Sequence, residues 1–352
     1  MYLLARAQSL SGRPDDALVM LRRLAALGVP NDAATNEAFR PVRELARWAE
    51  LAEGPADAAP PPRVAPEPAK PRDVPSKPAA TRDMIRFTMP PFSPAGLAYD
   101  AVSRRFIIGD RQARKLAVVD EFSQHVANLA GAQAGFGEIS ALEIDPQEGT
   151  LWVVSADSRQ TALHKLQLVS ARSLAIYPAR ESHGPVRFAD VAATSASAVF
   201  ALDSAGHRVF RLRPRQPTLE VAVTLPDNQP SSMAPASDGL LYVAHDGGVI
   251  RVDLSSLTTA PLKAGTGVEL AGIRRLRWYR GALIAIQQAG AGSYRAIRLA
   301  LDRAGRTATG IEILDAALPT TDPTAATVAG GVLYYLATGE GAEMIVRRVV
   351  LR

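Results

Sequence analysis

The sequence predicts an all-β six-bladed β-propeller preceded by a small α-helical segment, and three observations support this prediction. From residue 84 onward, short apolar runs alternate with Gly, Asp, Asn and Pro, which is the pattern of strands joined by tight turns. A four-strand unit recurs six times at a spacing of about 45 residues, the length of a propeller blade. Nine of the 26 prolines fall in residues 52–83, so a spacer separates the N-terminal segment from the repeats.

Residues 1–51 are predicted to form two antiparallel helices and a third helix. Apolar side chains recur every three or four positions on both sides of a break at Gly12 and Pro14, and Gly28 and Pro30 end the second helix. The run LARAQSLSGRPDDALVMLRRLAALGV resembles a tetratricopeptide repeat. This resemblance implies a protein partner for the hairpin, the propeller face or both; the alternative is a hairpin that only covers the propeller.

Residues 52–83 are predicted to be a disordered Pro/Ala-rich linker. The segment lacks the apolar side chains that would offset the entropy of ordering the chain, and its prolines favour extended polyproline II conformation. The remaining residues, 84–352, are assigned to the propeller.

Each predicted blade begins with an innermost strand of small residues, followed by a hairpin of two apolar strands and an outer strand. Hairpins with Gly or Asp at their tips are predicted at 200–212, 241–254 and 283–301. Aromatic residues in these strands are expected in the core between blades. The six innermost strands are predicted at 95–100, 140–145, 189–194, 232–237, 275–280 and 325–330.

Composition excludes several classes of chemistry. The chain has no Cys, which excludes disulfides, thiolate metal sites and cysteine nucleophiles. It has no run of eighteen apolar residues that would predict a membrane span. The net charge is +5, but basic residues are not gathered in any segment, so no nucleic-acid partner is predicted. The sequence also lacks zinc-binding, serine-hydrolase and nucleotide-binding motifs.

Five segments carry a resemblance to a known family, and the likeness spans about residues 84–352. Their sequences resemble blades of the senescence marker protein, gluconolactonase and luciferin-regenerating enzyme family, and also blades of NHL-type propellers. The segments are SPAGLAYDAVSRRFIIGD (93–110), SALEIDPQEGTLWVVSAD (140–157), SDGLLYVAHDGGVIRVDL (237–254), YRGALIAIQ (279–287) and DPTAATVAGGVLYYLATGE (322–340).

The resemblance implies a metal site that this sequence has lost. Active members of that family hold one divalent cation in the central channel through a Glu, two Asn and an Asp, and the cation polarises a lactone carbonyl and activates water. The corresponding positions here are Ala95, Ala189, Ser231 and Arg274. No catalytic residue, metal ligand or cofactor is therefore predicted, and the leading hypothesis is a non-enzymatic interaction or ligand-binding platform.

One alternative function uses the same channel. A divergent metal-dependent lactonase or esterase would require a divalent cation on relocated ligands, for which Glu138, Asp190 and Glu143 are the candidates.

A second alternative concerns the basic residues near the starts of the third and fifth blades. Together they could form an anion-binding or partner-binding site at the channel mouth, with Asp190 nearby. The competing interpretation is that they pair with acidic residues or face solvent. These basic residues are Arg187, Arg274, Arg275 and Arg277.

The sequence is compatible with two compartments. The sequence as written carries no signal peptide before residue 1, which predicts the cytoplasm, whereas a missing export segment would place the protein in the periplasm.

Overall fold

The computed structural model divides the chain into two compact units, residues 1–75 and 76–352. It describes residues 2–10, 14–26, 32–45, 48, 82–88 and 92–351, apart from 131–133, 159, 195–197, 227–228, 237–238, 291, 321–323 and 339–342. The proposed linker at 52–83 therefore lies outside the described residues except for its last two positions, where the first strand begins.

The first unit is helical, as its apolar periodicity predicts. It contains α1 (Tyr2–Leu10), α2 (Pro14–Ala26), a 3₁₀ turn (Glu37–Phe39) and α3 (Arg40–Arg43). Its core includes Leu18, Leu21 and the fully buried ring of Phe39. Leu10, predicted to lie on the apolar face of the first helix, is 67% exposed. The likeness to a tetratricopeptide repeat stays a prediction.

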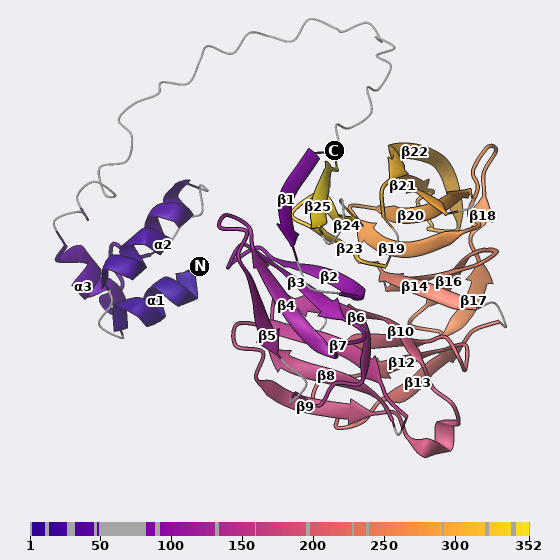
Figure 1. Ribbon diagram of the computed structural model, residues 1–352, viewed down its shortest axis with the longest axis horizontal. Helices are drawn as coiled ribbons and strands as arrows, with labels where there is room; N and C mark the ends of the chain where they lie inside the picture. Colours follow the sequence, from indigo (N-terminus) through magenta and orange to yellow (C-terminus); the bar gives the residue numbers. More distant parts are fainter. Residues whose placement is uncertain are drawn as a thin grey trace, which may run out of the picture. The chain divides into compact units, whose positions relative to one another are not determined.

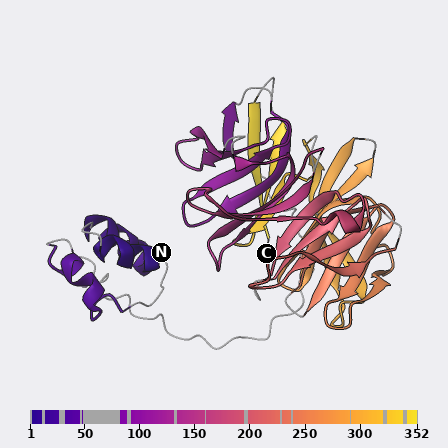
Figure 2. The ribbon, with the colours of Figure 1, turned by 90° about the horizontal axis from the view of Figure 1, so that it is seen from below.

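The second unit is the predicted six-bladed propeller, whose sheets follow one another in chain order (Figures 1 and 2). Blades 1 to 3 consist of β2 (Pro94–Asp100), β3 (Arg105–Asp110), β4 (Lys115–Asp120) and β5 (Val126–Ala130); β6 (Glu138–Asp145), β7 (Thr150–Ala156), β8 (Thr161–Gln167) and β9 (Ser173–Pro178); and β10 (Phe188–Ala193), β11 (Val199–Asp203), β12 (Arg208–Leu212) and β13 (Glu220–Thr224). A second 3₁₀ turn (Glu181–His183) precedes β10.

Blades 4 to 6 repeat the same order of strands from the centre outward, with additions at the edges. They consist of β14 (Pro230–Pro235), β15 (Leu240–His245), β16 (Gly248–Asp253) and β17 (Thr258–Pro261); β19 (Ile273–Tyr279), β20 (Ala282–Gly290), β21 (Ser293–Leu301) and β22 (Thr307–Leu318), with β18 (Lys263–Ala264) added beside β22; and β23 (Ala326–Ala329), β24 (Val332–Thr338) and β25 (Glu343–Val350).

An N-terminal strand closes the ring. β1 (Arg82–Thr88) pairs antiparallel with β25, from Arg82 opposite Arg348 to Thr88 opposite Glu343, and is the outer strand of blade 6. The propeller therefore begins at Arg82, two residues before the predicted start, and its last blade combines both ends of the repeat region. This pairing leaves no unpaired outer edge on β25.

The core lies between successive blades. Trp152 and Phe210 share a cluster between blades 2 and 3, and Tyr242 stacks on Trp278 between blades 4 and 5 with ring centroids 5.9 Å apart. Tyr335 is fully buried. These aromatic residues therefore serve packing, as predicted from their place in apolar strands.

Among the described residues, no helix combines the length and apolar character needed to cross a membrane.

Candidate functional site

Five innermost strands carry an irregularity near their first residues, where they meet the central channel. In each case the pairing register with the next strand shifts, so one residue, or two in β2, has no direct partner. A bulge of this kind redirects the side chain of the extra residue. The bulge residues are Ala95 with Gly96, Ser140, Ala189, Ser231 and Arg274.

Gly96 shows why this position constrains the sequence. Its φ of +86° lies in the left-handed region, and an added Cβ would come within 3.1 Å of the backbone nitrogen of Leu142 in the next blade. A side chain at this position would therefore be strained as well as crowded.

Four of the five bulges contribute to the wall of a cavity of about 480 Å³ at the starts of the innermost strands, which we call the channel mouth. Their residues there are Ser140, Ala189, Ser231 and Arg274. Arg111, Arg187 and Arg274 line it together with the acidic residues Glu138 and Asp246. Ser140, Ala189, Ser231, His207 and Thr324 also contribute to its wall. The mouth thus combines residues from all six blades.

The four positions that correspond to the family's metal ligands do not fit a divalent cation. Ala95 and Ala189 offer no side-chain oxygen, and the Ser231 hydroxyl donates to the carbonyl oxygens of Ile273, at 3.0 Å, and Ala244. Arg274 donates to Asp246 at 2.7 Å and to Gln288 at 3.1 Å. In the part of the chain that the structure describes, no group of three or more His, Asp or Glu side chains could hold a metal ion.

A buried ionic cluster joins the innermost strands of blades 3, 4 and 5, and we call it the channel plug: Asp190, Ser232, Arg275 and Arg277. Arg275 Nη1 lies 2.7 Å from Asp190 Oδ1, and Arg277 Nη1 lies 3.2 Å from Asp190 Oδ2. The Ser232 hydroxyl donates to Asp190 Oδ2 at 2.6 Å. Each of these residues is at least nine-tenths buried, so the pairs are shielded from water.

The plug also joins blades through the backbone. The backbone N–H of Met233 donates to Asp190 Oδ2 at 2.9 Å, and Arg275 Nε donates to the carbonyl oxygen of Ala326 at 3.0 Å. Arg277 Nη2 lies 3.4 Å from Glu143 Oε2 in blade 2. Blades 2 to 6 therefore meet in one network at the channel axis.

The electrostatics of the plug keep Asp190 ionised. Burial opposes its charge, but the positive charges of Arg275 and Arg277 outweigh burial and lower the pKa of the Asp190 carboxyl to about 2. Burial, with the repulsion of Arg277, lowers the pKa of Arg275 to about 10. Burial likewise raises the pKa of Glu143, although the positive charge of Arg277 opposes this effect.

The structure separates the residues that the sequence grouped at the mouth. Arg187 and Arg274 line it, but Arg275 and Asp190 are buried in the plug and do not. The bulge explains the difference, because Arg274 is the extra residue of β19 and Arg275 resumes pairing, opposite Ile286. Asp190 likewise follows the bulge residue of β10. Of the three candidates for relocated metal ligands, only Glu138 lines the mouth.

Arg277, which the sequence also grouped at the mouth, lies in the plug as well. Residues two apart in a strand point to the same face, so Arg277 follows Arg275 to the same side of β19. Sequence reasoning gave no channel role to Ser232 or Arg111. Nothing in the sequence around these two residues indicates a place in the channel, because a single Ser or an Arg in a turn is common on protein surfaces.

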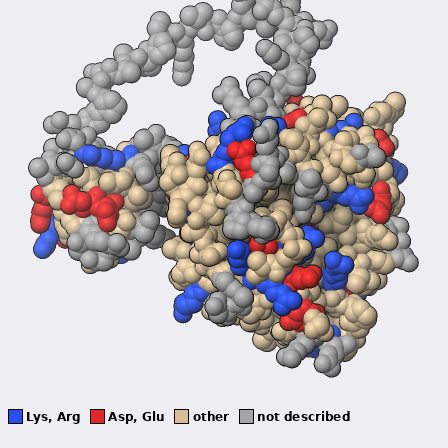
Figure 3. Space-filling view, viewed as in Figure 1, with Lys and Arg blue, Asp and Glu red and all other residues tan. Residues whose placement is uncertain are grey.

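On the face shown in Figure 3, basic and acidic side chains of the described residues lie interspersed, which fits the even charge distribution in the sequence.

No protein-family model and no curated protein matches the chain. Solved structures do. A gluconolactonase from Xanthomonas campestris is 16% identical, with a TM-score of 0.54, over 78% of this chain and 90% of the other. A luciferin-regenerating enzyme is 13% identical, with a TM-score of 0.53, over 77% of this chain and 95% of the other. A virginiamycin B lyase from Staphylococcus aureus is 11% identical, with a TM-score of 0.54, over 78% and 100%.

The chain shares the six-bladed propeller fold of these proteins. At such identities the likeness shows the fold alone, so the residues of the channel must carry any argument about activity.

Proposed function

We propose that the propeller is a non-enzymatic ligand-binding platform whose channel mouth takes a small anion bearing carboxylate or phosphate groups. One observation carries this proposal. Arg187 is exposed at the mouth, and its guanidinium group has no ionic partner among the described residues, while Arg274 lines the same cavity. A guanidinium group offers a planar fork of N–H donors that matches carboxylate and phosphate oxygens.

The surroundings of Arg187 support the same ligand class. The mouth holds three arginines against two acidic residues, and Asp246 is engaged by Arg274 at 2.7 Å. A cavity of about 480 Å³ lies within the usual range for small-molecule sites. The hydroxyl groups of Ser140 and Ser231 in the wall donate to backbone carbonyl oxygens, so the donors for an anion are the arginines.

The residues of the plug favour an anion-binding function over metal-dependent hydrolysis. Arg275 and Arg277 place two guanidinium groups in the channel, and a divalent cation brought near them would meet electrostatic repulsion. Asp190, one candidate for a relocated ligand, already accepts hydrogen bonds on both oxygens. The alternative function, a divergent lactonase or esterase, would have to rely on Glu138 and other residues of the mouth.

The test is a comparison of variants by thermal unfolding, with citrate and inorganic phosphate as probes. We expect at least one probe to raise the melting temperature of the wild-type protein and of Arg280→Ala, whose side chain lies over Tyr279 in the β19–β20 turn, away from the mouth. Arg187→Ala and Arg274→Ala should lose most of this rise.

Three outcomes would contradict the proposal. They are the absence of any rise in the wild-type protein, an unchanged rise in Arg187→Ala, and hydrolysis of gluconolactone at enzyme-like rates that depends on calcium, zinc or manganese. The last outcome would favour the lactonase alternative.

A further inference from the structure

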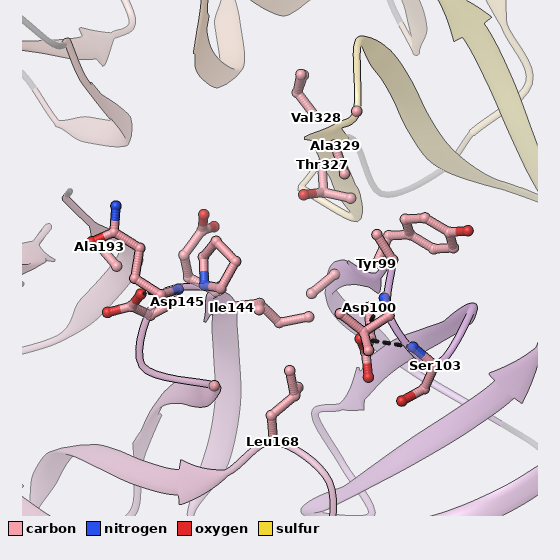
Figure 4. A pocket seen from close by; sticks show the side chains of 18 of the residues that line it. Tyr99, Asp100, Ser103, Ile144, Asp145, Leu168, Ala193, Thr327, Val328 and Ala329 are labelled. Carbon is pink, nitrogen blue, oxygen red and sulfur yellow. Dashed lines mark hydrogen bonds between the residues drawn. The ribbon is translucent and has the colours of Figure 1, made fainter. Parts of the chain in front are cut away.

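A second cavity lies at the opposite end of the innermost strands, where β2, β6, β10 and β23 end. Its volume is about 620 Å³, and most of its lining residues are apolar. Figure 4 shows Asp100 of blade 1 and Asp145 of blade 2 on opposite sides, with Thr327 of blade 6 and Leu168 of blade 2 between them. We call it the acidic cavity, because the charged residues of its wall are Asp100, Glu143 and Asp145 and it has no Lys or Arg among its described lining residues.

Asp145 is a buried carboxylate with an unused oxygen. It is 3% exposed, and its Oδ1 accepts the backbone N–H groups of Gln147 at 3.0 Å and Glu148 at 3.2 Å. Its Oδ2 has no hydrogen-bond partner among the described residues, and it is not one of the side-chain oxygens that are fully enclosed without a partner, so a ligand in the cavity can reach it. A carboxylate that is largely removed from water and has no counter-ion gains from a nearby cation.

Comparison with blade 1 shows that the missing partner of Asp145 is not a general feature of the repeat. Asp100 holds the same place in blade 1 and closes the same kind of turn, but its Oδ2 pairs with Arg105 at 3.2 Å. In blade 2 the residue opposite Asp145 is Thr150, which brings no charge. The charge of Asp100 is therefore balanced within its own blade, whereas that of Asp145 is not.

Glu143 supplies a second carboxylate from the same strand. Its Oε2 lies 3.4 Å from Arg277, and its Oε1 has no partner among the described residues. Burial raises the pKa of Glu143, and the negative charges of Asp190 and Asp145 add to this effect against the opposing charges of Arg277 and Arg275. A cation between Glu143 and Asp145 would relieve their mutual repulsion.

We propose that the acidic cavity binds a small organic cation with an apolar body, whose ammonium group lies between Glu143 and Asp145. The apolar residues of the wall, such as Val102, Ile144 and Val169, would cover the body of this ligand. Val102 and Val169 are 56% and 68% exposed, so ligand binding would bury apolar surface that now faces solvent. The site shares no residue with the channel mouth and does not depend on the function proposed for it.

The test uses benzyltrimethylammonium, which carries a permanent charge, and its neutral isostere neopentylbenzene. In isothermal titration calorimetry, we expect the cation to bind the wild-type protein, and Asp145→Asn and Glu143→Gln each to weaken binding by about tenfold or more, or about 1.4 kcal/mol. The amide introduced by Asp145→Asn would keep an oxygen that accepts the turn N–H groups. The matched control is Glu148→Gln, because Glu148 pairs with Lys165 at 2.6 Å and lies outside the cavity wall.

The pH dependence adds an independent readout. Since a bound cation favours ionised Glu143, the affinity of the wild-type protein should rise from pH 5 to pH 8, and Glu143→Gln should flatten this rise. The proposal is wrong if the cation does not bind at millimolar concentration, if neopentylbenzene binds equally well, or if both carboxylate variants bind as tightly as Glu148→Gln.

Discussion

The two ends of the channel are built by the same ring of strands yet carry opposite charge. At the starts of the innermost strands, the mouth has three arginines against the two acidic residues Glu138 and Asp246. At their ends, the cavity wall carries acidic residues and no basic ones among those described. Between the two ends lies the plug, in which Arg275 and Arg277 meet Asp190.

This difference shows how a repeated backbone acquires distinct sites. The bulge recurs in five blades and the Asp-closed turn recurs at both Asp100 and Asp145, so geometry alone does not distinguish one blade from another. Single residues at equivalent positions distinguish the blades. The position of Arg105 in blade 1 is occupied by Thr150 in blade 2, and the bulge position of Ala189 in blade 3 is occupied by Arg274 in blade 5. The charge of each end of the channel is therefore determined by a few positions per blade.

The largest expected effect is removal of the charge that holds the plug together. Asp190→Asn would leave Arg275 and Arg277 buried without their shared carboxylate, and breaking a buried ion pair on one side costs about 3–5 kcal/mol. Urea denaturation at pH 7 should show a loss of unfolding free energy of this size. If the variant does not fold at all, the prediction holds in its strongest form.

Asp246→Asn is the matched control at the mouth. Asp246 also pairs with an arginine at 2.7 Å, but its side chain is 53% exposed, so we expect a loss of about 1 kcal/mol or less. Equal losses in the two variants would show that the plug is no more tightly coupled to folding than the mouth.

The fold was predictable because its signals are local and repeated. Hairpins at 200–212, 241–254 and 283–301 are antiparallel pairs, as the Gly and Asp tips predicted. The closure of the ring by β1 was not predictable in the same way, because the Arg82–Thr88 strand stands outside the repeat and pairs with residues more than 250 positions away.

The candidate site was predictable only in part. Arg187 and Arg274 reach the mouth, but the bulge in β19 turns Arg274 and Arg275 in different directions, and a one-residue register shift leaves no mark in the sequence. The acidic cavity was missed altogether. It depends on a carboxylate without a charged partner, which is visible only once the structure shows that Thr150 lies opposite Asp145 and that no Lys or Arg lines the cavity among the described residues.

A smaller effect is expected from a single hydrogen bond in the plug. Ser232→Ala removes the hydroxyl that donates to Asp190 and accepts the N–H of Leu276, which should cost about 1–3 kcal/mol. Because the pKa of Asp190 is lowered, its stabilising effect is present above about pH 4 and is lost as the pH falls toward 2. Loss of the hydroxyl raises that pKa, so acid unfolding of Ser232→Ala should begin at higher pH.

Ser231→Ala tests whether this shift belongs to the plug. The Ser231 hydroxyl donates to two backbone carbonyl oxygens and does not touch Asp190. It should lose about 1 kcal/mol without moving the acid transition. A shift of the same size in both serine variants would contradict the assignment of the transition to Asp190.

The smallest effect should be a change in pH dependence at the acidic cavity. The folded protein holds the Glu143 proton more tightly than the unfolded chain, because burial raises the pKa of this carboxyl. Stability therefore falls as the pH rises through the range in which Glu143 ionises. Glu143→Gln cannot ionise and still offers Arg277 an oxygen, so its unfolding free energy relative to wild type should increase from pH 4 to pH 8.

The exposed mouth residue Glu138 provides the comparison. Glu138→Gln should change the unfolding free energy by less than about 0.5 kcal/mol, as is usual at the surface. If the unfolding free energy of Glu143→Gln has the same pH dependence as that of wild type, ionising Glu143 does not destabilise the folded protein. The repulsion from Asp145 on which the cation site depends is then absent. If only Glu143→Gln diverges from wild type as the pH rises, the two ends of the channel differ in the free energy of charging a carboxylate as well as in sign.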